Sequence, residues 1–360
     1  YDNIDLILKE KFKIKKNDPN SKLTNDEKFC EIVSQKKSQF NKIKEIDIEM
    51  PSKKIASMFL DAIYNQNHII IYALLKFLCE NFQNFNKKYF FDLFNNLMDN
   101  KRTYNFLNLY EDFFKTKNFF LSKVYFLFLY KSIIHYKNQE NTTGSLEATT
   151  INFEEIFYLL LDSLNFLYKT CGELKNYNYE ILEELRETLY WIYSCVIELI
   201  SPITTENFTD EESAKDSNFI YFNNSLKIIN TPNTIIDIFI LLNEDSELTG
   251  FVSRIFRKSI QNVLDDLNIY QKMPEKNNIV NESLKGLIAD PEKAQKFISF
   301  VQICLMRYIN YPEIYSNILL IIICLCNENK YPEMIRNLLD NLDISLICSG
   351  FDNYRGNLKK

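Results

Sequence analysis

Apolar side chains recur at helical spacing along nearly the whole chain, and this period limits the fold more than any other feature. After Pro51, for example, one helix face is formed by Ile55, Met58, Phe59, Ala62 and Ile63. Strand signals are nearly absent, because no Asn-Gly or Asp-Gly turn occurs and six glycines are too few for many hairpins. The sequence therefore predicts an all-α protein of about fourteen helices.

Some of these segments are apolar on more than one side, as a helix with neighbours on both sides requires: 69–80, 119–134 and 314–326. Three C-terminal helices begin at a proline: Pro291, Pro312 and Pro332. In these features the chain resembles armadillo- or HEAT-type α-solenoids, although it shows no period of about 40 residues. The resemblance implies an irregular superhelix of stacked helices with an extended surface for binding a protein or peptide.

Two polar stretches interrupt the helical pattern. Residues 137–150 contain a single large apolar side chain, and residues 202–217 are polar and acidic, which is typical of linkers and surface loops. We therefore predict five segments: an N-terminal helical part at 1–136, a linker at 137–150, a central helical hairpin at 151–201, an acidic loop at 202–217 and C-terminal helical repeats at 218–360. A single continuous solenoid across these segments is the alternative.

The residue types that build most enzyme sites are scarce or poorly placed. The two histidines, His68 and His135, lie in apolar helices, and no Glu-x-x-His or His-x-x-x-His pair occurs. All six glycines are isolated, which excludes the glycine-rich loops that bind nucleotide phosphates. We therefore expect no enzymatic activity, no catalytic, cofactor-binding or metal-binding residues, and no cofactor.

The cysteines and the longest apolar segment bear on location. None of the eight cysteines forms a Cys-x-x-Cys pair, and five lie in apolar helical runs, where free thiols pack as small apolar groups. This usage is typical of a reducing compartment. The longest apolar segment, 119–134, contains two lysines and is shorter than the ~20 residues of a membrane span. We expect no transmembrane segment and a cytoplasmic location, with the nucleus as the alternative.

Acidic charge is concentrated in the middle of the chain. The formal net charge is −6 overall, whereas residues 141–250 hold 5 basic and 19 acidic side chains, a net charge of −14. This balance argues against DNA binding and favours a basic protein partner. We expect four acidic residues of the polar loop and its flank to face that partner: Glu206, Asp210, Glu211 and Glu212.

These features favour a non-enzymatic scaffold or adaptor domain of a larger protein, which binds a protein partner on an extended helical surface. The alternative is an RNA-associated scaffold, similar to the helical middle domains of translation and RNA-decay factors. Its basic patch would lie within residues 36–54 and 87–102, and in the second range lysines and an arginine are interleaved with aromatic residues. A helical enzyme is a third, less favoured interpretation, and it would require a deep pocket with converging polar groups.

Overall fold

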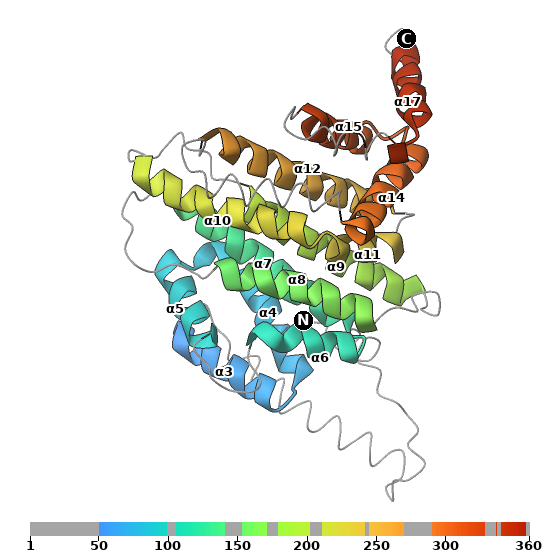
Figure 1. Cartoon of the computed structure of the whole chain (residues 1–360). Helices are drawn as coiled ribbons and strands as arrows, with labels where there is room; N and C mark the ends of the chain where they lie inside the picture. The colour runs from blue at the N-terminus through green and yellow to red at the C-terminus, as the bar shows by residue number, and fades with distance from the viewer. Residues whose placement is uncertain are drawn as a thin grey trace, which may run out of the picture. The chain divides into compact units, whose positions relative to one another are not determined.

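The computed structural model describes eight segments of the chain and Arg336 (Figure 1): residues 50–98, 106–140, 153–170, 179–201, 211–241, 245–269, 290–327 and 340–357. These residues form thirteen α-helices and two short 3-10 helices, and they contain no β-strand. The prediction of an all-α protein is therefore confirmed. In the same part of the chain, no helix is both long and apolar enough to cross a membrane.

The chain divides into two compact units. Unit 1 comprises residues 1–132 and 147–151, and unit 2 comprises residues 133–146 and 152–360. Helix α7, Phe119–Glu140, therefore belongs to unit 1 for most of its length and to unit 2 at its end. The stretch predicted as a linker begins inside this helix, and its remaining residues, 141–150, lie outside the described residues.

Aromatic side chains form the core of unit 1. Besides most of α7, this unit contains the helices α3 Ser52–Tyr64, α4 His68–Glu80, α5 Lys87–Met98 and α6 Leu109–Lys115, and the 3-10 helices Phe82–Asn84 and Phe106–Asn108. The rings of Phe94 and Phe128 stack with their centroids 5.6 Å apart, and Phe106 meets both of them edge to face. All three side chains are almost completely buried. Such ring pairs add about 0.5–1.5 kcal/mol each to the burial of their apolar area.

Unit 2 arranges its helices in two rows. Its helices are α8 Phe153–Thr170, α9 Tyr179–Ile200, α10 Glu211–Asn230, α11 Asn233–Leu241, α12 Ser246–Ile269, α14 Pro291–Arg307, α15 Pro312–Asn327 and α17 Ile344–Asn357. In one row, α12 packs between α9 and α15; in the other, α8, α11, α14 and α17 pack in succession (Figure 1). Helix α10 packs against α9 and α12.

Helices α9 and α12 run in the same direction. Arg186 near the start of α9 bonds Asp245 beside the start of α12, whereas the Ile200 carbonyl at the end of α9 bonds Asn262 near the end of α12. These partners lie 59 and 62 residues apart in the sequence. In the second row, Lys296 of α14 bonds Asp237 of α11, again 59 residues away. The contacts that join α9 to α12 and α11 to α14 therefore span similar lengths of chain.

One element differs from its sequence-based boundary. We expected an acidic loop at 202–217, but α10 begins at Glu211, so the second part of this stretch is helical. Residues 202–210 lie outside the described residues. The difference has a simple electrostatic reason, since Glu211 and Glu212 place negative charge at the positive end of the helix dipole. Acidic residues that suggest a loop by composition therefore also favour a helix start.

Candidate functional site

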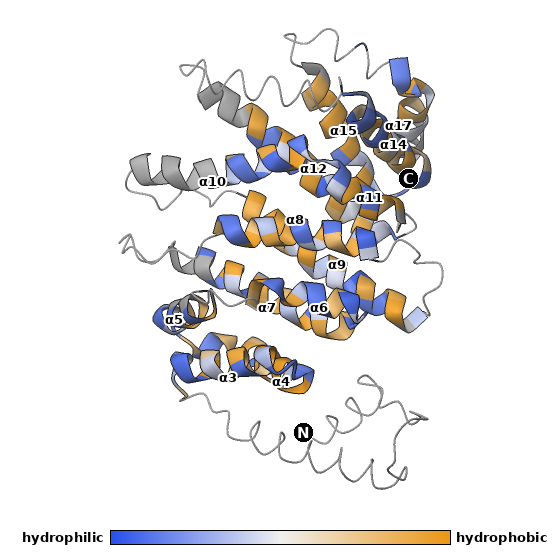
Figure 2. Ribbon diagram, turned by 60° about the horizontal axis from the view of Figure 1, so that its bottom comes forward, coloured by the Kyte–Doolittle hydropathy of each residue, from blue (hydrophilic) through white to orange (hydrophobic). Residues whose placement is uncertain are grey.

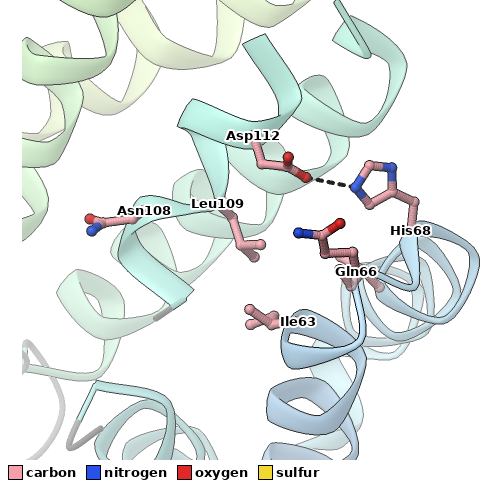
Figure 3. A pocket seen from close by; sticks show the side chains of 7 residues that line it. Ile63, Gln66, His68, Asn108, Leu109 and Asp112 are labelled. Atoms are coloured by element: carbon pink, nitrogen blue, oxygen red, sulfur yellow. Dashed lines mark hydrogen bonds and ion pairs between the residues drawn. The ribbon is translucent and has the colours of Figure 1, made fainter. Parts of the chain in front are cut away.

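A polar pair lies beside a small pocket in unit 1. His68 Nε2 of α4 and Asp112 Oδ2 of α6 are 2.7 Å apart, and both side chains are partly exposed (Figure 3). Gln66 has a φ of 50°, in the left-handed region, and it forms the turn between α3 and α4. Asn67 then caps α4 by accepting a hydrogen bond from the Ile70 amide at 3.3 Å. This turn positions His68 as the first residue of the helix, facing α6.

The pocket is too small for a typical substrate. Its volume is about 40 Å³, and Ile63, Gln66, Asn108 and Leu109 form much of its wall (Figure 3). That space accommodates a few water molecules, whereas small-molecule sites usually measure several hundred cubic ångströms. The lining residues include no serine, threonine, cysteine or lysine, so the imidazole of His68 has no nucleophilic side chain to activate. The contact between His68 and Asp112 therefore has a structural role, in which it joins the start of α4 to α6.

Buried thiols are poorly suited to nucleophilic chemistry. Burial raises the pKa of the Cys79 thiol to about 12, and it also raises the pKa of Cys195 and Cys304. A cysteine attacks as its thiolate, which these groups scarcely form at neutral pH. Burial lowers the pKa of His135, so its imidazole is mainly neutral at pH 7. No group of three or more His, Cys, Asp or Glu side chains in the described part of the chain is placed to hold a metal ion.

The predicted partner-binding residues fall in a part of the chain that the structure describes least. Glu206 and Asp210 lie outside the described residues. Glu211 and Glu212 form the first turn of α10, where the backbone alone is described. Their role in binding a basic partner therefore remains a prediction.

An exposed apolar strip lies on α15 in unit 2. One side of this helix packs on α12, where Asn317 Nδ2 donates to Ser253 Oγ at 3.1 Å. Away from this contact, Leu320 and Ile323 leave 40% and 55% of their surface exposed. They are three residues apart and so share one face of the helix, and α15 has no charged residue after Glu313. Figure 2 shows the apolar character of this helix.

The sequence shows that this strip is apolar but not that it is exposed. The apolar pattern of residues 314–326 predicts neighbours on both sides of the helix, whereas the structure leaves the face of Leu320 and Ile323 open. Hydropathy alone does not distinguish an apolar side chain that packs internally from one that remains available to a partner. Compared with protein-family models, with curated proteins and with solved structures, the chain shows no match.

Proposed function

We propose that the chain is a non-enzymatic scaffold or adaptor domain that binds a protein partner on the outer face of α15. The observation that carries this proposal is the exposed pair Leu320 and Ile323 on an uncharged helix face. Single exposed apolar residues are common on protein surfaces, but neighbouring ones on one face form the kind of patch that partners bury. Complete burial of such a side chain from water contributes about 1.5–3 kcal/mol. Because roughly half of each of these two side chains is still exposed, a partner could gain about half of that energy from each.

The row arrangement supports a superhelix of the armadillo or HEAT type as the framework for this surface. Helices α9 and α12 run parallel, and the contacts between α9 and α12 and between α11 and α14 join residues about 60 positions apart, as in stacked structural repeats. In such a stack each helix covers the exposed side of the one before it, as α12 covers α9 and α15 covers α12. A partner helix with an apolar face would occupy the corresponding position on α15.

The double substitution Leu320→Gln with Ile323→Gln tests the proposal. Partner proteins are cross-linked to the chain in cells, and their recovery is compared between the wild type and the double variant. The variant should recover about tenfold less partner, because a loss of about 1.4 kcal/mol in binding free energy lowers the affinity tenfold. The matched control is Tyr179→Gln, which alters an exposed residue of the same unit. Equal recovery with the double variant and the control, at equal stability towards urea, would contradict the proposal.

Three exposed lysines favour RNA binding as a second candidate. Lys53 and Lys54 lie in the first turn of α3, and Lys88 lies in the first turn of α5. Tyr89 Oη donates to the Met50 carbonyl at 3.0 Å, which brings the two helix starts together. Neither first turn contains an acidic residue, so the lysines add to the positive ends of both helix dipoles. Phosphate groups are attracted to such a surface.

Replacement of these three lysines by glutamate tests whether the chain is an RNA scaffold rather than a protein-binding scaffold. For an RNA scaffold, the triple variant Lys53→Glu, Lys54→Glu and Lys88→Glu should lose single-stranded RNA in a filter-binding assay, and wild-type binding should weaken steeply with added salt. Lys169→Glu, an exposed lysine of α8, is the control. If wild-type protein retains no RNA at low salt, or if the triple variant binds as well as the control, this second candidate is excluded. The predicted patch residues 36–49 and 99–102 lie outside the described residues.

A further inference from the structure

Three aromatic residues lie together on α9 and α12 and form what we call the aromatic surface. Tyr190 and Trp191 belong to α9, and their ring centroids are 4.9 Å apart. The ring of Phe251 in α12 lies 4.9 Å from that of Tyr190, with the two rings edge to face. All three residues are half-buried, so part of each remains accessible to solvent. Such residues are enriched at protein interfaces, because they supply a large contact area at a low cost in conformational entropy.

One cation of the chain itself already lies on this surface. The guanidinium of Arg254, in the same helix as Phe251, lies 5.8 Å from the centre of that ring. Its charge is compensated, because it pairs with Glu313 of α15. A cation is attracted to the negative face of an aromatic ring, most strongly to that of tryptophan. The rings of Tyr190 and Trp191 therefore offer a partner the same kind of contact.

Carboxylates outnumber cations beside the aromatic surface. Arg186, one helical turn before Tyr190, pairs with the carboxylates of Glu183, Asp245 and Glu247. The side chains of Glu183 and Glu247 are 42% and 51% exposed, so a partner can reach both. One guanidinium cannot neutralise three carboxylates, which leaves a surplus of two negative charges next to the rings. This combination of rings and carboxylates is complementary to basic side chains.

Positive charge is found towards the other end of the same two helices. Lys137 and Lys258 both donate to Ser201, which follows the last residue of α9. Arg257 and Lys258 lie about two helical turns after Phe251 in α12. These cations would repel a basic partner. The surface that attracts one is therefore confined to the first part of α9 and α12.

We propose that the aromatic surface, together with Glu183 and Glu247, binds a segment of a partner protein that is rich in arginine or lysine. A guanidinium or ammonium group of this segment pairs with Glu183 or Glu247, while its apolar stem packs against Tyr190 or Trp191. Arginine fits best, because its planar group both stacks on rings and pairs with carboxylates. Exposed ion pairs are individually weak, so binding requires several basic residues close together. A basic partner is also what the acidic composition of residues 141–250 predicts.

This surface differs from the exposed strip of α15, and it rests on the proposed function only in requiring a protein partner. The variant with Leu320→Gln and Ile323→Gln should therefore bind a basic peptide as the wild type does. Undiminished partner recovery with that variant contradicts the role of α15, whereas absent peptide binding by the wild type contradicts the role of α9 and α12. The two failures are thus distinguishable.

Titration of the full chain with an oligoarginine peptide at low salt, followed by fluorescence anisotropy of a label on the peptide, tests the proposal. The wild type should bind this peptide and not an oligoglutamate peptide. The variant with Glu183→Gln and Glu247→Gln should bind about three- to tenfold more weakly, as the loss of two exposed ion pairs predicts. The matched control, Glu155→Gln with Asp162→Asn, removes two exposed acids of α8 in the same unit and should bind as the wild type does. Unlabelled peptide should change the fluorescence of Trp191, the single tryptophan of the chain.

Tyr190→Leu tests the aromatic contribution separately, because it keeps an apolar side chain and every carboxylate. It should bind the peptide about threefold more weakly, since a cation–ring contact at an exposed site is lost. Three results would overturn the proposal: no binding by the wild type, equal binding by the double glutamine variant and its control, or binding that leaves Trp191 fluorescence unchanged. Equal binding by Tyr190→Leu and the wild type would do so as well, because the charges alone would then explain the attraction.

Discussion

Substitution of Phe128 by alanine is expected to lower the free energy of unfolding of unit 1 by about 3–5 kcal/mol. The ring is fully buried and lies 5.6 and 5.9 Å from the rings of Phe94 and Phe106, so its removal leaves a cavity among aromatic groups. Urea titration with pulse alkylation of Cys79 measures the effect, because this thiol is buried in unit 1 and reacts when the unit opens.

The control for this prediction is Tyr64→Ala, at a side chain that is 70% exposed on α3. Its effect should stay within about 0.5 kcal/mol, as for most surface substitutions. The chain has one tryptophan, Trp191 in α9 of unit 2, and its fluorescence reports the unfolding of that unit separately. An alkylation midpoint for Phe128→Ala equal to that of Tyr64→Ala would show that the aromatic cluster does not hold unit 1 together.

Substitution of Lys137 by methionine is expected to destabilise unit 2 by about 2–4 kcal/mol. Methionine retains the apolar stem of the lysine, but it removes the ammonium group that donates to the carbonyls of Glu198 and Ser201 and to the Glu198 carboxylate. The Lys137 side chain is only 13% exposed, so water replaces these bonds poorly. Urea unfolding followed by Trp191 fluorescence measures the loss, because this residue belongs to the same helix.

The comparison variant is Lys258→Met in α12, which removes an ammonium group that donates to the hydroxyl of Ser201, the residue whose carbonyl Lys137 bonds. It should be neutral or slightly stabilising, since Lys258 bonds a serine hydroxyl and lies near other cations. Both substitutions delete an ammonium group that bonds Ser201. A difference between their unfolding free energies therefore reports the bonds that only Lys137 makes, to the two carbonyls and the Glu198 carboxylate. A Lys137→Met midpoint equal to that of the wild type would mean that the end of α9 is adequately solvated without this side chain.

Individual helices were predictable because their signals are local. The face of α3 predicted from its period packs inward, since Ile55, Phe59, Ala62 and Ile63 are buried and Met58 is half-buried. Asp290 and Pro291 likewise begin α14, where the aspartate side chain accepts hydrogen bonds from the amides of Glu292 and Lys293. These outcomes depend on the helical repeat and on capping geometry, which residues within one or two turns decide.

The candidate sites were much less predictable, because each joins residues that are distant in the sequence. His68 was recognised in an apolar helix, but its partner Asp112 lies 44 residues away. Ser201 likewise accepts hydrogen bonds from Lys137 and Lys258, which are 64 and 57 residues away from it in the sequence. No short motif connects such positions, and the period of about 40 residues typical of armadillo and HEAT repeats is shorter than the roughly 60 residues that separate bonded positions of α9 and α12.

The amino-acid sequence by itself determined that this chain is helical and which face of many helices is apolar, because periodicity and capping act over a few residues. Tertiary structure alone decided which helices became neighbours, which lysines met at the end of α9, and that Leu320 and Ile323 remained exposed. The physical reason is that apolar burial has no direction of its own. An apolar helix face favours burial, and the packing of the whole unit decides which neighbour, if any, covers it.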